Sequence, residues 1–374
     1  MQTNKLIPVA EPDIGELEEK FLLDAFRSGW ISSIGEYISR FEREFANFCN
    51  CKHAVAVSNG TVAIQLALLA SGIGAGDEVI VPALTFAATA AAVKHVGATP
   101  IFVDSDPLIG TLDLRHVENS ITSLTKAIIP VHLYGHPADM DQILNIANKY
   151  GLIVIEDAAE AHGAKYKNRI VGSMGDMSTF SFYGNKLITT GEGGMIVTNN
   201  SVYAEKIRFL KDHAMEKNRR YWHNDVGYNF RMTNLQAAIG CAQLSRFQEI
   251  LAKRERVLND YKRAAAKNPK IVINPFLPYA TPVPWLVSAI LPHNTNCKFR
   301  DALIDHLRIH GVDSRPYFYP LPLMPPYKNT NRYKDNDFSN AMQLSDRGLS
   351  LPSSTSLDTK SINEIVDKIL AFLD

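Results

Sequence analysis

One lysine stands where an apolar strand gives way to a loop of small residues. Lys186 follows the run Ser178-Thr-Phe-Ser-Phe-Tyr and precedes Thr189-Thr-Gly-Glu-Gly-Gly194. Burial lowers the pKa of a lysine and frees its amine to attack a carbonyl carbon. The small neighbours leave room for a flat molecule beside that amine. Lys186 is therefore a candidate for a covalent bond to an aldehyde, whereas a surface lysine at a strand end is the simpler interpretation of this residue alone.

A carboxylate and a possible phosphate cradle complement this lysine. Asp157 ends an apolar run that reads as a parallel strand, and ligands of open α/β sheets bind at such strand ends. The segment Ser58-Asn-Gly-Thr61 joins a strand to a helix, whose free N–H groups suit a phosphate. Each has a structural alternative, because a loop carboxylate often caps a turn and Ser or Asn often caps a helix.

Together these features match the needs of one cofactor, pyridoxal 5′-phosphate (PLP). PLP requires a lysine for its aldehyde, an acid for its pyridine nitrogen, a phosphate cradle and a flat partner for its ring. The chain offers residues for all four parts: Lys186, Asp157, Gly60 and Thr61 with Ser181, and Phe86. The sequence thus predicts a PLP site.

Two other patterns do not predict a binding site. The run Gly72-Ile-Gly-Ala-Gly76 follows a helix and precedes a strand, the reverse of a dinucleotide fingerprint. Cys49 and Cys51 lie close together, but a second ligand pair at metal spacing is missing from the sequence. We therefore expect no metal site and ordinary reduced thiols.

The elements that must position these residues read as an α/β fold. Short apolar runs at 54–57, 79–81, 100–103, 127–131 and 152–155 alternate with helical patterns, and two more follow at 177–182 and 195–198. This alternation predicts a mainly parallel sheet with helices on both faces. Proline-rich connections mark the later part of the chain. We expect a large α/β domain over 1–250, including N-terminal helices, and a smaller C-terminal α+β domain over 251–374.

The composition and charge of the chain argue against some classes of function. The 374 residues carry 39 Lys and Arg against 39 Asp and Glu, so the net charge is zero. A nucleic-acid partner usually demands a basic surplus, so none is expected. The first residues are polar, without the apolar core of a leader, and the most apolar stretch is too short for a bilayer. We expect a cytoplasmic protein with no membrane insertion.

Several motifs together resemble the DegT/DnrJ/EryC1/StrS family of PLP-dependent nucleotide-sugar aminotransferases, over nearly the whole chain. The motifs are Ser58-Asn-Gly-Thr61, Val79-Ile-Val-Pro82 through Phe86, Glu156-Asp-Ala-Ala-Glu-Ala-His-Gly163, Gly175-Asp176 through Lys186, Gly191-Glu-Gly-Gly194 and Tyr228-Asn-Phe-Arg-Met-Thr-Asn234. The resemblance implies a fold type I PLP-dependent aminotransferase, with a large, mainly parallel seven-stranded sheet domain and a smaller C-terminal α+β domain.

The resemblance also implies roles for matching residues. Lys186 is expected to bond the cofactor aldehyde and to move the proton, Asp157 to hold the pyridine nitrogen, and Glu160 to lie near the ring hydroxyl. The phosphate contacts expected from the family are Gly60, Thr61 and Ser181. Asn234 is expected to reach that phosphate from a neighbouring subunit, which implies a homodimer with shared active sites or a tetramer built from it.

The implied reaction moves an amino group from L-glutamate to a sugar. PLP becomes pyridoxamine 5′-phosphate in the first half, and the C4 keto carbon of a nucleotide-linked 4-keto-6-deoxy sugar takes the amine in the second. Segments such as Trp30-Ile-Ser-Ser33 and Ser314-Arg-Pro316 favour the family members that use GDP-4-keto-6-deoxy-D-mannose for surface polysaccharide such as O-antigen. His162 departs from the apolar residue expected in those members.

Candidate substrate contacts follow from the same segments and from a basic cluster near residue 219. Arginine forks match phosphate oxygens, although such a cluster equally suits a solvated loop. The candidates are Trp30, Ser33, Arg219, Arg220, Arg231 and Arg315. Two alternatives remain open at this point: an aminotransferase for a UDP- or dTDP-linked keto sugar or a cyclitol, and a regulator that has kept the fold without catalysis.

Overall fold

A seven-stranded sheet forms the centre of the chain. The computed structural model describes residues 6–266, 268, 270–328, 333 and 337–373. The strand order is β1-β9-β8-β5-β4-β2-β3. The bounds in that order are β1 (His53–Val57), β9 (Gly194–Thr198), β8 (Met177–Ser181), β5 (Ile153–Asp157), β4 (Thr125–Ile128), β2 (Glu78–Pro82) and β3 (Thr99–Val103).

The sheet is parallel except at β9, which runs antiparallel to both β1 and β8. Its strands are short and nearly all buried, because helices cover the sheet and leave no polar face. The predicted large, mainly parallel seven-stranded sheet is therefore confirmed. The reversed β9 follows the Lys186 loop, so this loop is a turn between antiparallel neighbours rather than a crossover.

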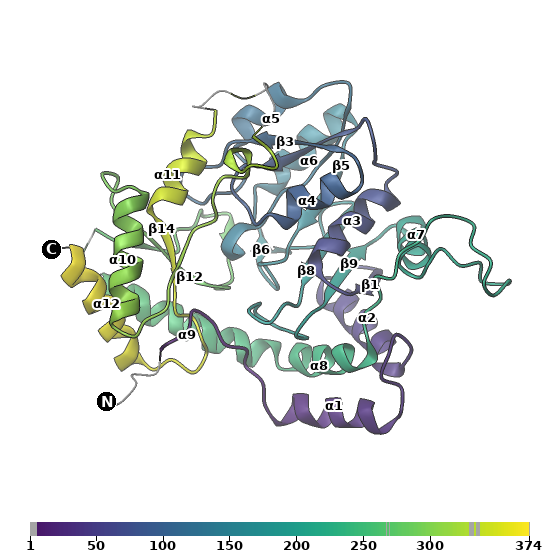
Figure 1. Cartoon of the computed structure of the whole chain (residues 1–374), viewed down its shortest axis with the longest axis horizontal. Helices are drawn as coiled ribbons and strands as arrows, with labels where there is room; N and C mark the ends of the chain where they lie inside the picture. The colour runs from purple at the N-terminus through teal and green to yellow at the C-terminus, as the bar shows by residue number, and fades with distance from the viewer. Residues whose placement is uncertain (1–5, 267, 269, 329–332, 334–336, 374) are drawn as a thin grey trace.

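Helices surround the large sheet (Figure 1). Their bounds are α1 (Glu16–Arg27), α2 (Glu36–Phe48), α3 (Gly60–Ala70), α4 (Ala88–His95), α5 (Leu114–Ser120), η1 (Leu133–Gly135), α6 (Met140–Tyr150), α7 (Ser201–Lys211), α8 (Asn234–Ser245) and α9 (Phe247–Ala265). α8 packs against both α1 and α2. α3 is apolar on all sides, as expected for a helix enclosed between the sheet and other helices.

A smaller region holds the later part of the chain, on the left in Figure 1. Its antiparallel four-stranded sheet has the order β10-β12-β14-β13. Its elements are β10 (Val272–Ile273), β12 (Val287–Ile290), α10 (Cys297–Ile309), β13 (Arg315–Pro316), η2 (Leu321–Leu323), α11 (Ser339–Arg347), β14 (Gly348–Leu351) and α12 (Thr359–Leu373). A three-stranded ribbon joins β11 (Ala280–Thr281) to β6 (Lys165–Tyr166) and β7 (Arg169–Ile170). The predicted smaller strand-containing part is confirmed.

The long helix α9 connects the two parts (Figure 1). Val257 and Tyr261 of α9 lie in the core of the smaller part, whereas Phe247 and Ile250 lie in the core beneath the large sheet. The domain boundary predicted at 250/251 falls inside this helix and stays a prediction. Within the described residues, each helix is too short or too polar to cross a membrane.

Candidate active site

A pocket of about 810 Å³ opens at the carboxyl ends of the central strands. β5 and β8 supply its floor, the start of α3 supplies one end, and the smaller part supplies a wall that includes Trp285, Arg315 and Phe318. Parallel strands all present their carboxyl ends at one edge, which is where α/β sheets bind ligands. Residues that are far apart in the sequence therefore meet here.

Lys186 lies in this pocket with its side chain 11% exposed. Its Nζ is 3.8 Å from Oε1 of Glu160 and 3.9 Å from the centre of the Trp285 ring. Burial lowers the pKa of Lys186, and the nearby carboxylates of Glu160 and Asp157 oppose that shift. The structure thus places the amine of Lys186 in the pocket, between the carboxyl group of Glu160 and the aromatic face of Trp285.

Asp157 ends β5 and lies on the pocket floor, 5% exposed. Its Oδ2 accepts a hydrogen bond of 2.8 Å from the Thr89 hydroxyl, and its Oδ1 accepts one from the Ala159 N–H. Burial raises the pKa of Asp157, while these two donors favour the charged form. A buried carboxylate with few partners is suited to a cationic ring nitrogen, because the cation would complete its neutralisation.

Glu160 follows on the same segment and is 4% exposed. Its Oε2 accepts a 2.7 Å hydrogen bond from the N–H of Tyr134. Burial raises the pKa of Glu160 to about 7, although Lys186 acts in the opposite direction. Glu160 is therefore a buried carboxyl group that can carry a negative charge beside Lys186, which a glutamine at this position could not do.

The start of α3 lines the pocket, at the place where the sequence predicts a phosphate cradle. Asn59 caps the helix by accepting from the Val62 N–H, and Gly60 and Thr61 begin its first turn. The backbone here approaches β8 closely, since a Cβ on Gly60 would lie 2.9 Å from Cβ of Ser181. Free N–H groups, a positive helix end and two hydroxyls make a donor set that fits a phosphate dianion. These residues fit the phosphate of PLP, as Asp157 and Lys186 fit its ring and aldehyde.

Phe86 lines the same pocket and is 58% exposed. Its ring contacts that of Phe318 in the smaller part, with the ring centres 5.7 Å apart and the planes tilted. An exposed aromatic face inside a pocket is suited to stacking on a flat ring. Phe86 therefore lies where the sequence placed it, beside the lysine and the acid.

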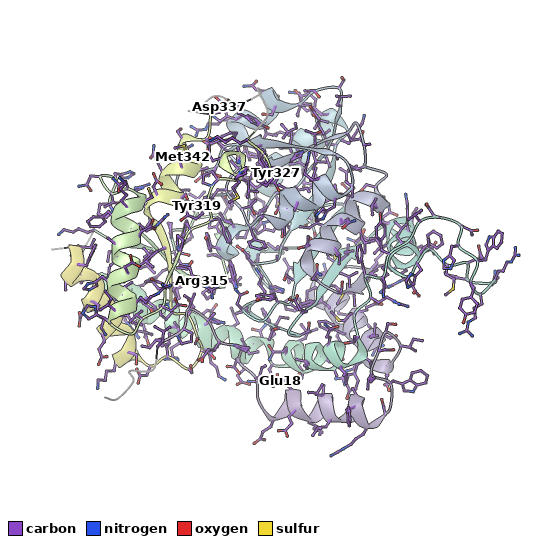
Figure 2. All side chains as sticks on the ribbon, in the orientation of Figure 1. Glu18, Arg315, Tyr319, Tyr327, Asp337 and Met342 are labelled. Atoms are coloured by element: carbon purple, nitrogen blue, oxygen red, sulfur yellow. The ribbon has the colours of Figure 1, made fainter. Side chains whose placement is uncertain are left out.

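The six candidate substrate contacts separate into two groups. Arg315 lines the pocket from β13, at the edge of the smaller part that faces the large sheet (Figure 2). The other five lie outside the described lining of that pocket: Trp30, Ser33, Arg219, Arg220 and Arg231. Arg231 is instead paired with Asp212 at 2.7 Å. A single chain therefore brings one predicted substrate cation to the pocket.

Asn234 is buried at the start of α8, 2% exposed. Its side-chain oxygen accepts from the Tyr37 N–H, and its amide nitrogen donates to the Trp30 carbonyl. Within the chain, Asn234 thus fixes the loop that carries Trp30 and Ser33. Its expected contact with the phosphate of a neighbouring subunit stays a prediction.

The sequence analysis missed several residues that shape the site. Thr89 bonds Asp157, Tyr134 bonds Glu160, and Trp285 covers Lys186. Tyr134 has a left-handed backbone (φ 49°), which is uncommon for a residue other than glycine and often occurs at functional sites. The signal available in the sequence was its position shortly after the apolar run at 127–131.

A buried lysine, a buried carboxyl and a helix start meet at the carboxyl ends of a mainly parallel sheet, an arrangement that fits a PLP-dependent aminotransferase of fold type I. The model of the DegT/DnrJ/EryC1/StrS aminotransferase family matches residues 12–370. The chain belongs to this family.

Relatives of known name and structure agree with this assignment. The chain is 47% identical to the GDP-perosamine synthase of Caulobacter vibrioides, over 98% of this chain and 97% of that protein. It is 43% identical to the Escherichia coli O157:H7 protein of the same name, over 98% and 99%. The PLP form of a Streptococcus pneumoniae protein has a TM-score of 0.93 at 28% identity, with 98% of both chains covered. Streptomyces venezuelae DesV, solved with a ketimine intermediate, has a TM-score of 0.90 at 33% identity, with 99% of both chains covered.

Proposed function

We propose that this enzyme transfers an amino group from L-glutamate to the C4 keto carbon of a GDP-linked 4-keto-6-deoxy sugar, GDP-4-keto-6-deoxy-D-mannose, yielding GDP-perosamine for surface polysaccharide. The observation that carries the reaction type is the meeting of Lys186, Asp157 and the α3 cradle in one pocket. The name shared by relatives at 41–47% identity over nearly the full length supports the GDP-linked sugar.

The chain's own residues account for the cofactor half of this reaction. PLP supplies an aldehyde and an electron sink when it is bound. We assign the aldehyde to Lys186 and the pyridine nitrogen to Asp157, whose burial makes a charged partner favourable. Gly60, Thr61 and Ser181 hold the phosphate. The Nζ of Lys186 would accept and return the proton that the reaction moves, and the burial that lowers the pKa of Lys186 favours the neutral amine that this role requires.

The diphosphate of the proposed substrate is anionic, so its binding requires cationic side chains. Arg315 already lines the pocket, and Arg219 and Arg220 lie on the segment that projects after α7. We assign the diphosphate to these arginines, with Arg219 and Arg220 supplied by a second copy of the chain. A homodimer with shared sites follows from this assignment, and cytoplasmic nucleotide sugars would be its substrates.

Incubation of the purified protein with GDP-4-keto-6-deoxy-D-mannose and glutamate tests the proposal. We expect GDP-perosamine and 2-oxoglutarate in equal amounts, identified by mass and by the NMR couplings of the aminated ring. UDP- and dTDP-linked 4-keto sugars serve as matched substrates that keep the keto group and change the base. Faster amination of either would assign a different nucleotide. Absence of amination with all three would favour a cyclitol substrate or a regulator.

A further inference from the structure

The Lys186 amine is held from two sides by residues of different parts of the chain. Glu160 belongs to the segment after β5, and its Oε1 lies 3.8 Å from Nζ. Trp285 precedes β12 in the smaller part, and its ring centre lies 3.9 Å from Nζ. A carboxylate and an aromatic face both attract an ammonium ion, and both attractions strengthen away from water.

Trp285 also fixes the backbone beside the lysine. Its indole N–H donates a 2.9 Å hydrogen bond to the carbonyl of Asn185, the residue before Lys186. The indole is 4% exposed, so the tilt of its ring is fixed by packing. The hydrogen bond to Asn185 therefore holds the Trp285 ring in place over Nζ of Lys186.

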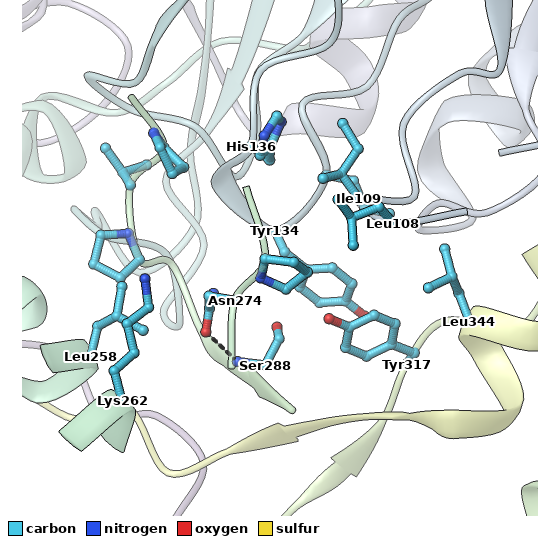
Figure 3. A pocket seen from close by; sticks show the side chains of 15 residues that line it. Leu108, Ile109, Tyr134, His136, Leu258, Lys262, Asn274, Ser288, Tyr317 and Leu344 are labelled. Atoms are coloured by element: carbon cyan, nitrogen blue, oxygen red, sulfur yellow. Dashed lines mark hydrogen bonds between the residues drawn. The ribbon is translucent and has the colours of Figure 1, made fainter. Parts of the chain in front are cut away.

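Tyr134 links the two sides. Its N–H donates to Glu160, and its ring stacks on Trp285 at 5.8 Å and on Tyr317 at 4.4 Å. Figure 3 shows the rings of Tyr134 and Tyr317 side by side in a second, smaller pocket that both residues line. The left-handed backbone of Tyr134 directs its N–H toward Glu160 and its ring toward Trp285, so one residue sets both partners of the amine.

We propose that Glu160 and Trp285 form a cation clamp that determines how readily the free Lys186 amine takes up a proton. The inference rests on the proposed role of Lys186. In this clamp, the large part of the chain supplies the charge of Glu160 and the smaller part supplies the aromatic face of Trp285. Tyr134 contacts both residues and fixes their relative positions. Glu160 and Trp285 are then positioning residues for the proton transfer.

The other groups that face Lys186 do not replace the clamp. Asp157 favours the charged amine but is bonded to Thr89 and Ala159. His162 is buried among aromatic rings, and burial together with Lys186 lowers its pKa to about 3, so it is neutral. Tyr134 is held uncharged because burial raises its pKa. Arg315 and Glu192 line the same pocket with opposite charges.

Labelling of the cofactor-free protein tests the clamp without turnover. Formaldehyde with cyanoborohydride methylates only the neutral amine, so the labelling rate of the Lys186 peptide against pH reports proton uptake. We expect Glu160→Gln to move the midpoint to lower pH, with roughly tenfold faster labelling below it. Trp285→Leu should move it the same way, roughly threefold, and Trp285→Phe less, because phenylalanine has a weaker face.

Two controls keep the result specific. The Lys262 peptide in the same samples reports a lysine beside Phe276, outside the pocket, and its profile should be unchanged in the Glu160 and Trp285 variants. Phe276→Leu should leave the Lys186 profile unchanged. If Trp285→Leu does not fold, Trp285→Phe decides the aromatic half of the clamp.

Unchanged Lys186 midpoints in Glu160→Gln and in the folded Trp285 variants would overturn the clamp, even if their turnover fell. Failure of the proposed function has a different signature. Borohydride treatment of the loaded wild-type protein would then leave no cofactor fixed on Lys186. The two failures are therefore distinguishable, the first in the cofactor-free variants and the second in the loaded wild-type protein.

Discussion

The pocket floor and the arm formed by residues 213–227 are both rich in charged and aromatic side chains, yet they are built differently. On the floor, Asp157 and Glu160 are almost fully buried, and each accepts bonds from the same chain. The arm projects from the body after α7, away from the smaller part (Figure 1). There, Tyr221 is 75% exposed and Trp222 is 49% exposed.

The arm's contacts are largely with itself. Arg219 stacks on Trp222 at 3.9 Å, and Arg220 stacks on Tyr221 at 4.9 Å. Glu216 and Trp222 both bond Asn224. Contacts within the chain thus organise the floor without a ligand. In the arm, Arg219 and Arg220 are each stacked on an aromatic ring and exposed. One chain therefore organises the pocket floor by its own contacts, whereas the exposed arginines of the arm remain outside the pocket of that chain.

The largest effect should come from removing the amine on the floor. Lys186→Ala leaves no group to bond the aldehyde or to move the proton, so we expect turnover to fall by about 10⁴-fold or more. Borohydride followed by peptide mass should fix the cofactor on wild-type Lys186 and not on the variant. Lys94→Ala, at an exposed site on α4, is the control and should retain full activity. Normal turnover by Lys186→Ala would contradict the role proposed for Lys186.

Changing the acid on the floor should have the next largest effect. Asp157→Asn keeps the size but loses the charge opposite the ring nitrogen, so the proton-transfer step should slow by about 10²–10⁴-fold. Thr89→Val removes only the hydroxyl that donates to the Asp157 carboxylate, so the rate of this step should fall by roughly tenfold at most. Stopped-flow absorbance with glutamate alone measures both. Equal losses in the two variants would mean that Asp157 acts only through packing.

Weakening the arm should affect one substrate and spare the other. Arg219→Ala and Arg220→Ala should each raise KM for the nucleotide sugar roughly tenfold, because one charge-assisted phosphate contact is lost. KM for glutamate should stay unchanged, and the effect should shrink with added salt. Lys206→Ala on α7 is the control for a lost surface charge. A matching rise in KM for glutamate would place the arm in folding rather than in nucleotide binding.

Mixing subunits sharpens the comparison further. If the arm serves the pocket of a second copy, a Lys186→Ala chain and an Arg219→Ala/Arg220→Ala chain should complement each other. One site of the heterodimer then carries both lesions and the other carries neither. Activity at low nucleotide sugar should recover toward half of the wild-type value per heterodimer. Heterodimers confirmed by mass but without recovery would show that each arm serves its own chain.

The smallest effect concerns a side chain just beneath the floor. His162 is fully buried between Phe180 and Phe182, and neither ring nitrogen has a hydrogen-bond partner of normal geometry among the described residues. His162→Leu should therefore raise the free energy of unfolding by about 1 kcal/mol at neutral pH. Urea unfolding measures this difference.

The pH dependence follows from the lowered pKa of His162. The folded protein keeps this imidazole neutral down to about pH 3, whereas an unfolded chain protonates it near the ordinary value of about 6.5. Wild-type stability should therefore fall as the pH drops below about 6.5, and His162→Leu should lose less. A variant that is less stable than the wild type at pH 5 would show that the imidazole has a useful partner.

Much of the fold and the cofactor site could be predicted from the sequence, because both depend on local pattern. Apolar runs ending in Asp157 or leading to Lys186 mark strand ends, and parallel strands bring their ends to one edge. The cradle followed from Gly60 and Thr61 at a strand–helix junction. Trp285 could not be found this way, because the sequence gives no sign of which loops of the two parts meet over Lys186, and Tyr134 was marked only by its place shortly after an apolar run.

The sequence by itself determined the residue types, the alternation of strands and helices, and hence the edge of the sheet where Lys186 and Asp157 meet. Only the tertiary structure decided what touches them. The proton affinity of a buried amine depends on the groups within a few ångströms. For Lys186 these groups are Glu160 and Trp285, which lie more than a hundred residues apart from each other along the chain. Likewise, Arg219 and Arg315 each precede a tyrosine by two residues in the sequence, and tertiary structure alone places Arg315 in the pocket wall and Arg219 on a projecting arm.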